Sequence, residues 1–294
     1  MAYDPAFIHD SVVPLPTLSS RLVLDAFNNG VPVDHSRFSI AFSQTRGFAI
    51  YTAHNIDGAT ILPAGQIPRV DRFRSDPKVP SQLQVDNDRG YRSNPWDRGH
   101  LVQRGALHWG NPADATLADA ESYFWTNIAP QHETLHDTAW GQIEDWMLTY
   151  TDAADQGAAV FTGPVLLPED PTVVNRPGEA PVQIPSGFWK VVAIRSGGQL
   201  QAAGFLVWQR DFDKPDPVAF APFLEQVRVT TIEFLTGLSF GDLRDADPLR
   251  FGTEPTVGPA RPHAAPAHAG VRPTRRAAVI TAPADIYMPV RPIR

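Results

Sequence analysis

One short segment combines residue types that could hydrolyse a phosphodiester. Residues 96–102 read WDRGHLV and include Asp97, Arg98 and His100. Such hydrolysis needs a base that deprotonates water and positive charge beside the phosphate, which a histidine and an arginine can supply. Asp97 could orient either neighbour through hydrogen bonds, and Gly99 would let the backbone turn tightly before His100. The segment therefore predicts one half of a hydrolytic site.

A second segment, residues 126–146, supplies groups that could hold a metal ion. His136 and Glu144 are eight residues apart, close to two helical turns, so both would point from one face of a helix and serve one metal. Trp140 lies between them and would pack that face against the strand that bears His100. His132 stands four residues before His136, so a His132/His136 pair is an alternative set of metal ligands.

Together the two segments resemble the DNA/RNA non-specific endonuclease family, the endonuclease G-like nucleases of the ββα-metal (His-Me finger) type. The family pattern is Asp-Arg-Gly-His, followed by Asn-x-x-Pro-Gln, a metal-ligand position, a Trp and a Glu. In this chain the matching positions are Asp97, Arg98, Gly99, His100, Asn127, Pro130, Gln131, His136, Trp140 and Glu144. Weaker similarity extends over most of residues 35–250.

The resemblance implies a mechanism as well as a fold. His100 would be the general base, and Glu144 would hold a metal-bound water. The other residues that it brings to the site are Arg98, Arg72 and Arg74, facing the scissile phosphate, and Asn127 as a supporting side chain. It also implies a ββα-metal core, one Mg²⁺, DNA and RNA as substrates, and products that end in 5′-phosphate. Little base specificity is expected, because the contacts would go to phosphate and sugar.

Two positions depart from the family pattern. The family usually carries Asn where this chain has His136, and imidazole is a softer ligand than an amide oxygen. The metal preference would therefore shift from Mg²⁺ toward Mn²⁺ or another transition metal, with Mg²⁺ still the first expectation. Leu148 stands where some members carry an arginine that contacts phosphate, and we expect Arg104 to substitute for it.

Two other functions remain open on the sequence. In the first, His136 has replaced a needed ligand, and the chain is a catalytically impaired pseudonuclease that binds nucleic acid or protein. In the second, His132 and His136 hold zinc in a phosphoesterase with another substrate, which leaves residues 97–100 without a role. A homodimer and a bound inhibitor or regulatory protein also remain open as partners.

Composition limits the class of protein. The 294 residues are 43% hydrophobic and include no cysteine, which excludes disulfides, thiolate zinc sites and cysteine nucleophiles. No apolar run is long enough to span a membrane, and the first residues do not resemble a signal peptide. We therefore expect a soluble, cytoplasmic protein without a membrane partner.

Charge is unevenly distributed along the chain. The net charge is −7, but six arginines and one aspartate give residues 255–294 a charge of +5, which leaves −12 for residues 1–254. So acidic a body cannot attract nucleic acid by its overall field. A nuclease of this composition needs a locally basic cleft and a cation.

A mixed fold must position the two segments. Alternating apolar residues predict an antiparallel pair of strands over residues 38–42 and 47–56, and a short strand is expected at residues 96–102. A helix over residues 135–150 is predicted by apolar side chains at helical spacing, namely Leu135, Ala139, Ile143 and Met147. The later expected elements are strands over residues 157–167, 187–196 and 200–209 and a closing helix over residues 220–235. We predict an α+β fold with a ββα-metal core on a mostly antiparallel β-sheet and flanking helices.

Composition also divides the chain into three parts. Residues 1–35 mix apolar and proline-containing pieces and are expected to form an irregular lead-in to a nuclease domain at residues 36–254. Residues 255–294 contain eight prolines and cannot pack a core of their own. The apolar piece of this tail, residues 277–290, could dock back on the domain.

Overall fold

In this computed structural model an eight-stranded sheet forms the centre of the molecule, and every neighbouring pair of its strands is antiparallel. The structure describes residues 1–92, 94, 96–132, 135, 139–153, 156–209, 224–251, 278–280 and 285–287. From one edge to the other the strands are β14 (Ala278–Ile280), β12 (Leu224–Val227), β11 (Gln199–Trp208), β10 (Gly187–Ser196), β7 (Gly157–Val165), β4 (Ala49–Asp57), β3 (Phe38–Phe42) and β2 (Val33–His35).

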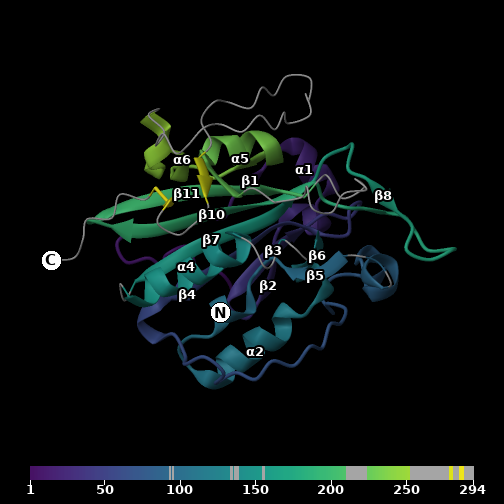
Figure 1. Cartoon of the computed structure of the whole chain (residues 1–294), viewed down its shortest axis with the longest axis horizontal. Helices are drawn as coiled ribbons and strands as arrows, with labels where there is room; N and C mark the ends of the chain where they lie inside the picture. The colour runs from purple at the N-terminus through teal and green to yellow at the C-terminus, as the bar shows by residue number, and fades with distance from the viewer. Residues whose placement is uncertain are drawn as a thin grey trace.

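Helices and a separate hairpin cover both faces of the sheet (Figure 1). On one face lie α1 (Ser20–Asp25), α5 (Val229–Thr236) and α6 (Leu243–Ala246); on the other lie α2 (Pro112–Ser122), α4 (Ala139–Ala153) and the hairpin of β5 (Trp96–His100) with β6 (Ile128–His132). Strand residues alternate between the two cores, so that Phe188 packs in the core beneath α4 while Trp189 packs in the core beneath α5. Because both faces are covered, the central strands are apolar along most of their length.

Two short antiparallel ribbons complete the strands. They are β1 (Thr17–Leu18) with β13 (Leu238–Ser239), and β8 (Thr172–Val173) with β9 (Val182–Gln183). The β8–β9 ribbon belongs to an arm that extends from the body in Figure 1.

The predicted α+β class and the mostly antiparallel sheet are confirmed. β3 and β4 form the expected pair, and their connection includes Gly47 at a φ of 72°, a backbone conformation that favours glycine. β7, β10 and β11 are the three later strands that the sequence predicts. Ile143 and Met147 of α4 are buried, as their helical spacing predicts, whereas residues 136–138 of the predicted helix lie outside the described residues.

The prediction of a closing helix over residues 220–235 is wrong at Leu224–Val227, which form β12; residues 210–223 lie outside the described residues. The backbone N–H of Val229 donates to Asp247 Oδ2 at 2.8 Å, so a residue far along the chain fixes the start of α5. The four residues of β12 complete hydrogen bonds on the open edge of β11. The apolar pattern of residues 220–235 gives no information about either partner, Asp247 or β11.

Both ends of the chain contribute strands to the sheet. Within the expected lead-in, β2 pairs with β3, and Tyr3 and Ile8 are buried. From the tail, β14 pairs with β12, and the Gln226 side chain exchanges hydrogen bonds of 2.7 and 2.9 Å with the backbone of Tyr287. Residues 278–280 and 285–287 of the apolar piece therefore dock on the domain. None of the described helices is long and apolar enough to cross a membrane.

Among the described residues, the β5–β6 hairpin does not pair with the large sheet. Side-chain hydrogen bonds connect it to the rest of the molecule instead. The buried Gln209 amide donates to the carbonyl oxygens of Pro130 and Pro185 at 2.9 and 2.8 Å. Its Oε1 accepts from the backbone N–H of His132 at 3.1 Å. Gln209 therefore connects β6 to the start of β10.

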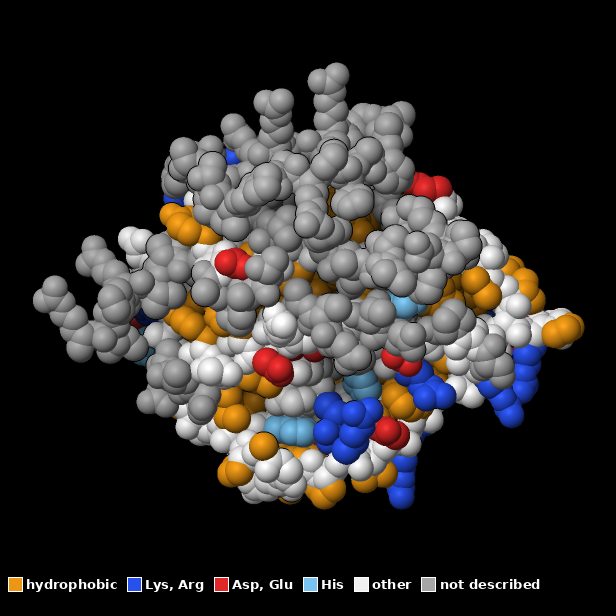
Figure 2. Space-filling model, in the orientation of Figure 1, with side chains coloured by type: hydrophobic (Ala, Val, Ile, Leu, Met, Phe, Trp, Pro, Cys, Tyr) orange, Lys and Arg blue, Asp and Glu red, His pale blue; other side chains and the backbone are white. Residues whose placement is uncertain are grey.

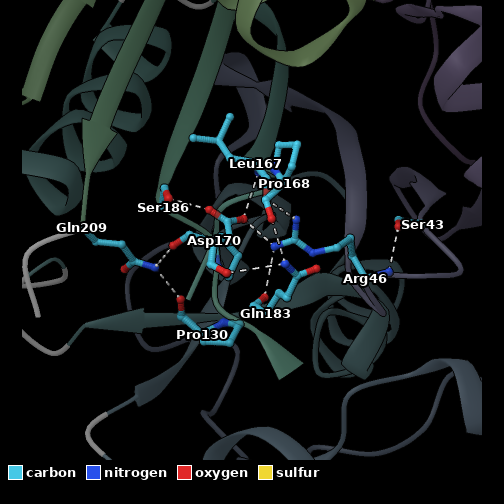
Figure 3. A network of polar contacts seen from close by, with 10 residues as sticks. Ser43, Arg46, Pro130, Leu167, Pro168, Asp170, Gln183, Ser186 and Gln209 are labelled. Carbon is cyan, nitrogen blue, oxygen red and sulfur yellow. Dashed lines mark hydrogen bonds and ion pairs between the residues drawn. The ribbon is translucent and has the colours of Figure 1, made fainter. Parts of the chain in front are cut away.

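The same connection continues toward the turn between β3 and β4 (Figure 3). Ser186 donates to Asp170 at 2.5 Å, and Asp170 forms an ion pair with Arg46. Arg46 also donates to the carbonyl oxygens of Leu167 and Gln183, each at 3.1 Å. This network fixes the loops at the end of the sheet on which the hairpin rests.

Candidate active site

His100 is the last residue of β5 and lies opposite Ile128 of β6. Its ring is held between two others: the Phe73 centroid is 5.7 Å away and the Tyr123 centroid 5.0 Å away, with Tyr123 nearly perpendicular at 87°. Such tilted and edge-to-face contacts restrict the orientation of the imidazole. Part of the residue remains exposed. An oriented, partly exposed imidazole is suited to general-base chemistry.

Tyr123 is in turn fixed by a charged pair. Its hydroxyl donates to Asp71 Oδ1 at 3.0 Å, and Asp71 forms an ion pair with Arg69 at 2.8 Å. Burial, together with the hydrogen bond to Asp71, raises the pKa of Tyr123, while the hydrogen bond from Arg69 lowers the pKa of Asp71. The hydroxyl therefore keeps its proton and the carboxylate keeps its charge near neutral pH.

Arg98 projects from the same face of β5 as His100, because the two residues are two positions apart in a strand. Its guanidinium donates to Asn87 Oδ1 from Nε at 3.2 Å and from Nη2 at 2.9 Å. It also lies 5.2 Å from the centroid of Phe73, the ring that contacts His100. A neutral amide and an aromatic face orient Arg98 without cancelling its charge, which is left for an anion. In Figure 2 basic side chains lie next to histidines on this part of the surface, near α2 and the hairpin.

Asn127 is fully buried and holds the backbone that follows His100. Its Oδ1 accepts from the N–H of Val102 at 2.9 Å, and its Nδ2 donates to the carbonyl oxygens of Val102 at 3.2 Å and Ser122 at 2.9 Å. The Asn127 carbonyl also accepts from the N–H of Leu101 at 2.9 Å. The supporting role that the resemblance implies would therefore act through the loop after β5.

Gly99 is required for a different reason from the one expected. The sequence predicts a tight turn, but Gly99 lies within β5 and pairs with Ala129 of β6. A Cβ at this position would stand 2.0 Å from Cδ of Gln131, whose buried side chain crosses the strand there. A larger residue at position 99 would therefore force the Gln131 side chain to move. The expectation of a turn is wrong, because Gly99 lies within a paired strand.

Asp97 lies on the opposite face of β5 from Arg98 and His100, since side chains alternate along a strand. Its side chain is exposed, and within the described part of the chain it makes no hydrogen bond or ion pair. The orienting role expected for Asp97 has no contact to support it here and stays a prediction.

The arginines of the long loop flank a ring that contacts His100. Arg72 and Arg74 are both exposed and flank Phe73. The Arg74 guanidinium lies 4.4 Å from the centroid of Phe124 and donates to the Arg72 carbonyl at 3.3 Å. Their positions beside the ring that contacts His100 suit contacts with a phosphate backbone.

Arg104, the expected substitute at the Leu148 position, is already paired. Its guanidinium lies 2.7 Å from Asp119 Oδ1, the same oxygen that His108 Nε2 approaches at 2.7 Å. Arg104 is near Leu148, because a Cβ on the adjacent Gly105 would lie 3.5 Å from the Leu148 side chain. The location fits the expectation, but Asp119 neutralises much of the charge.

Glu144 points into the core of the protein toward the sheet. The Glu144 Oε1 atom lies 3.1 Å from the ammonium group of Lys190, and both side chains are almost completely buried. Its other carboxylate oxygen accepts no hydrogen bond from the described residues. Within the described residues, this second oxygen of Glu144 is therefore open to a metal ion or a water molecule.

His136, the expected metal ligand, lies outside the described residues. Its placement beside His100 therefore stays a prediction. His132 closes β6 opposite Trp96, at the other end of the hairpin from the His100–Ile128 pair. Four residues of strand span about 13 Å, so a site built on His132 would be separate from one built on His100. Over the described ranges, no three His, Asp or Glu side chains form a group that could hold a metal.

Sequence reasoning missed Phe73, Tyr123 and Lys190. Phe73 is an aromatic residue inside a polar, arginine-rich loop, and a ring in that setting signals a packing contact. Lys190 interrupts the apolar strand GFWKVVA, where a charged side chain buried on either face needs a partner. Tyr123 carries no local signal, because its contact with His100 joins distant parts of the chain.

The chain is similar in sequence to known nucleases. A family model described as DNA/RNA non-specific endonuclease matches residues 21–247. The chain is 31% identical over 262 residues to an uncharacterized protein, y4fB, of Sinorhizobium fredii, a match that covers 78% of this chain and 37% of that protein. It is 29% identical over 175 residues to mitochondrial endonuclease G of Homo sapiens, with 57% of this chain and 55% of the relative covered. The chain thus spans only part of the length of these relatives.

The fold has a solved counterpart. A crystal structure described as the EndoG/EndoGI complex superposes with a TM-score of 0.57 at 20% identity, covering 72% of this chain and 86% of that one. At this level of identity the likeness concerns the fold, an α+β nuclease fold in which a two-stranded hairpin precedes a helix.

Proposed function

The chain belongs to the DNA/RNA non-specific endonuclease family, and from that premise we propose that it is a metal-dependent endonuclease acting on DNA and RNA. It would hydrolyse phosphodiester bonds with little sequence preference and leave 5′-phosphate products. The observation that carries the proposal is the pairing of His100 and Arg98 on one face of β5, both in contact with the Phe73 ring.

This geometry supports in-line attack on phosphorus. His100 would take a proton from a water molecule, whose oxygen forms the new bond to phosphorus while the bond to the 3′ oxygen breaks and that oxygen gains a proton. Arg98, assisted by Arg72 and Arg74, would neutralise the phosphate oxygens. Because these groups contact the backbone rather than base edges, they favour low sequence preference.

A divalent metal ion would add positive charge beside the phosphate and the departing oxygen. His136 and Glu144 would hold it, and the oxygen that Glu144 keeps free of hydrogen bonds from described residues fits a hard cation or its hydration water. The other Glu144 oxygen is 3.1 Å from an ammonium group, which favours contact with the ion through water. Mg²⁺ is the proposed ion, and Mn²⁺ or another transition metal is the alternative because of His136.

The proposed function also concerns the protein partners of the chain and its location in the cell. The structural relative was solved in the EndoG/EndoGI complex, whose description refers to inhibition of EndoG. This supports keeping a protein inhibitor among the partners of the present chain. A homodimer and a cytoplasmic location stay predictions.

The experiment compares His100→Ala with the wild-type chain in cleavage of plasmid DNA and of RNA. We expect a loss of about 10²–10⁴-fold in rate with Mg²⁺ or Mn²⁺, the usual contribution of a general base, and no cleavage in EDTA. His9→Ala is the matched control, because that ring is 89% exposed and belongs to no proposed site. Circular dichroism checks that each variant is folded.

Two outcomes would contradict the proposal. Unchanged cleavage by folded His100→Ala would remove His100 from the mechanism. A wild-type chain that binds DNA but cleaves nothing in Mg²⁺, Mn²⁺, Co²⁺, Ni²⁺ or Zn²⁺ would favour the pseudonuclease. Loss of activity in His132→Ala alone would favour the zinc phosphoesterase.

A further inference from the structure

Lys190 places an ammonium group inside the protein core. It lies in the middle of β10, and its side chain has no exposed surface. The neighbouring strand residues Trp189 and Val191 are apolar and buried. A buried lysine is stable only when other groups replace its lost hydration.

Three groups from two elements, α4 and β7, surround the ammonium. Glu144 Oε1 of α4 lies at 3.1 Å, Thr162 Oγ1 of β7 at 3.2 Å, and the Trp140 ring of α4 has its centroid 4.8 Å away. His54 of β4 is close enough for Lys190 to help lower its pKa. The side chain is thus fixed by contacts on the sheet and on the helix together.

These contacts determine how Glu144 is presented. Oε1 is bound to Lys190, while the second oxygen accepts no hydrogen bond from the described residues. Trp140 and Glu144 are four residues apart on α4, so their side chains share one face of that helix. Lys190 contacts both of them, and Glu144 is one of the two proposed metal ligands.

We infer that Lys190 is a positioning residue for the nuclease reaction, which holds the Glu144 carboxylate by one oxygen so that the other serves the active site. The inference rests on the proposed function. It explains why the core holds the Lys190–Glu144 ion pair, although methionine at position 190 and glutamine at position 144 would fill the same space. A buried ion pair generally adds little stability over apolar residues of similar volume, so stability alone does not account for the pair. Lys190 acts through Glu144 and does not touch substrate.

The test uses Lys190→Met, Glu144→Gln and the double variant, with Lys78→Met as control. Lys78 is an exposed lysine that contacts a backbone carbonyl of Asp34 and belongs to no proposed site. Thermal unfolding is measured in EDTA, and kcat and KM for plasmid DNA are measured at a temperature where every variant is folded. The unfolding measurement is independent of metal loading and of activity.

We expect Lys190→Met to unfold at a lower temperature than the wild type, because it leaves a buried carboxylate unpaired, and the double variant to recover most of that loss. We expect kcat to fall by about 10–100-fold in Lys190→Met, the usual effect of removing a residue that orients a metal-site ligand, with KM changed less than about threefold. The double variant should be no slower than the slower single variant, because the two residues act as a unit.

Chemical rescue separates positioning from simple packing. The chain contains no cysteine, so Lys190→Cys can be alkylated with 2-bromoethylamine in denaturant at that position and refolded. The product carries an ammonium group on a chain of lysine length. We expect it to regain at least about half of the wild-type kcat, while refolded, unalkylated Lys190→Cys stays low.

Each contrary outcome has a distinct meaning. Folded Lys190→Met that keeps kcat within about threefold of the wild type, or a double variant whose loss equals the product of the single losses, would overturn the inference while the nuclease function stands. If the wild-type chain itself cleaves no nucleic acid, the proposed function fails and the inference fails with it.

Discussion

Replacing His54 with leucine should remove a pH dependence from the stability of the fold. His54 is buried on β4, and neither ring nitrogen has a hydrogen-bond partner among the described residues. Burial, and to a smaller extent the positive charge of Lys190, lower the pKa of His54 to about 3. In the unfolded chain the same side chain titrates near pH 6.5.

The sign and size of the effect follow from these two values. Below about pH 6.5 the unfolded state binds a proton at His54 that the folded state does not, so stability falls as the pH falls, until the folded pKa is reached. Lowering the pH from about 7.5 to about 5.0 should therefore cost about 2 kcal/mol, at about 1.4 kcal/mol for each pH unit below 6.5. For a domain of this size that corresponds to roughly 4–8 °C in Tm.

Leucine does not titrate and leaves no former hydrogen-bond partner unsatisfied. The His54→Leu variant should match or exceed the wild type in stability at pH 7.5 and gain about 2 kcal/mol over it by pH 5.0. Denaturant unfolding followed by tryptophan fluorescence at several pH values measures this, and subtracting the two curves removes titrations common to both proteins. His9→Leu serves as the exposed control. Parallel curves, within about 0.5 kcal/mol, would refute the buried, neutral state assigned to His54.

Two further substitutions test how the hairpin is built. Gly99→Ala should destabilise the fold by about 1–3 kcal/mol, because its Cβ would meet the Gln131 side chain at 2.0 Å, and Gln131→Ala in the same chain should recover much of that loss in denaturant unfolding. Asn127→Ala should cost about 3 kcal/mol and slow cleavage, because it leaves buried backbone groups of Val102 and Ser122 without partners; unchanged stability would show that water replaces the amide.

The elements that the sequence predicts correctly are those whose pattern is complete within a single segment. β7, β10 and β11 are apolar runs bounded by turns, and Ile143 and Met147 mark the buried face of α4 by spacing alone. Residues 224–227 have no such local signature. They become a strand because β11 has an open edge, and the following helix starts at Val229 because Asp247 accepts its first N–H.

The candidate site shows the same division. His100 and Arg98 share a strand face, so their proximity follows from two-residue spacing. The two rings that orient His100 belong to Phe73 and Tyr123, and both are distant from it in sequence. The partner of Glu144 is Lys190 of β10, which is also distant from Glu144 in sequence. A motif specifies which groups take part, whereas the residues that orient them are brought in by the fold.

Because β14 covers β12, residues 255–294 cannot be removed as though they were an appendage. A chain cut at residue 254 would leave unpaired those backbone N–H and C=O groups of β12 that face β14, an edge onto which a second molecule could add. A deletion meant to measure what the six tail arginines contribute to DNA affinity would then measure self-association as well. Neutralising those arginines in the uncut 294-residue chain keeps the edge covered and changes only the charge of the tail.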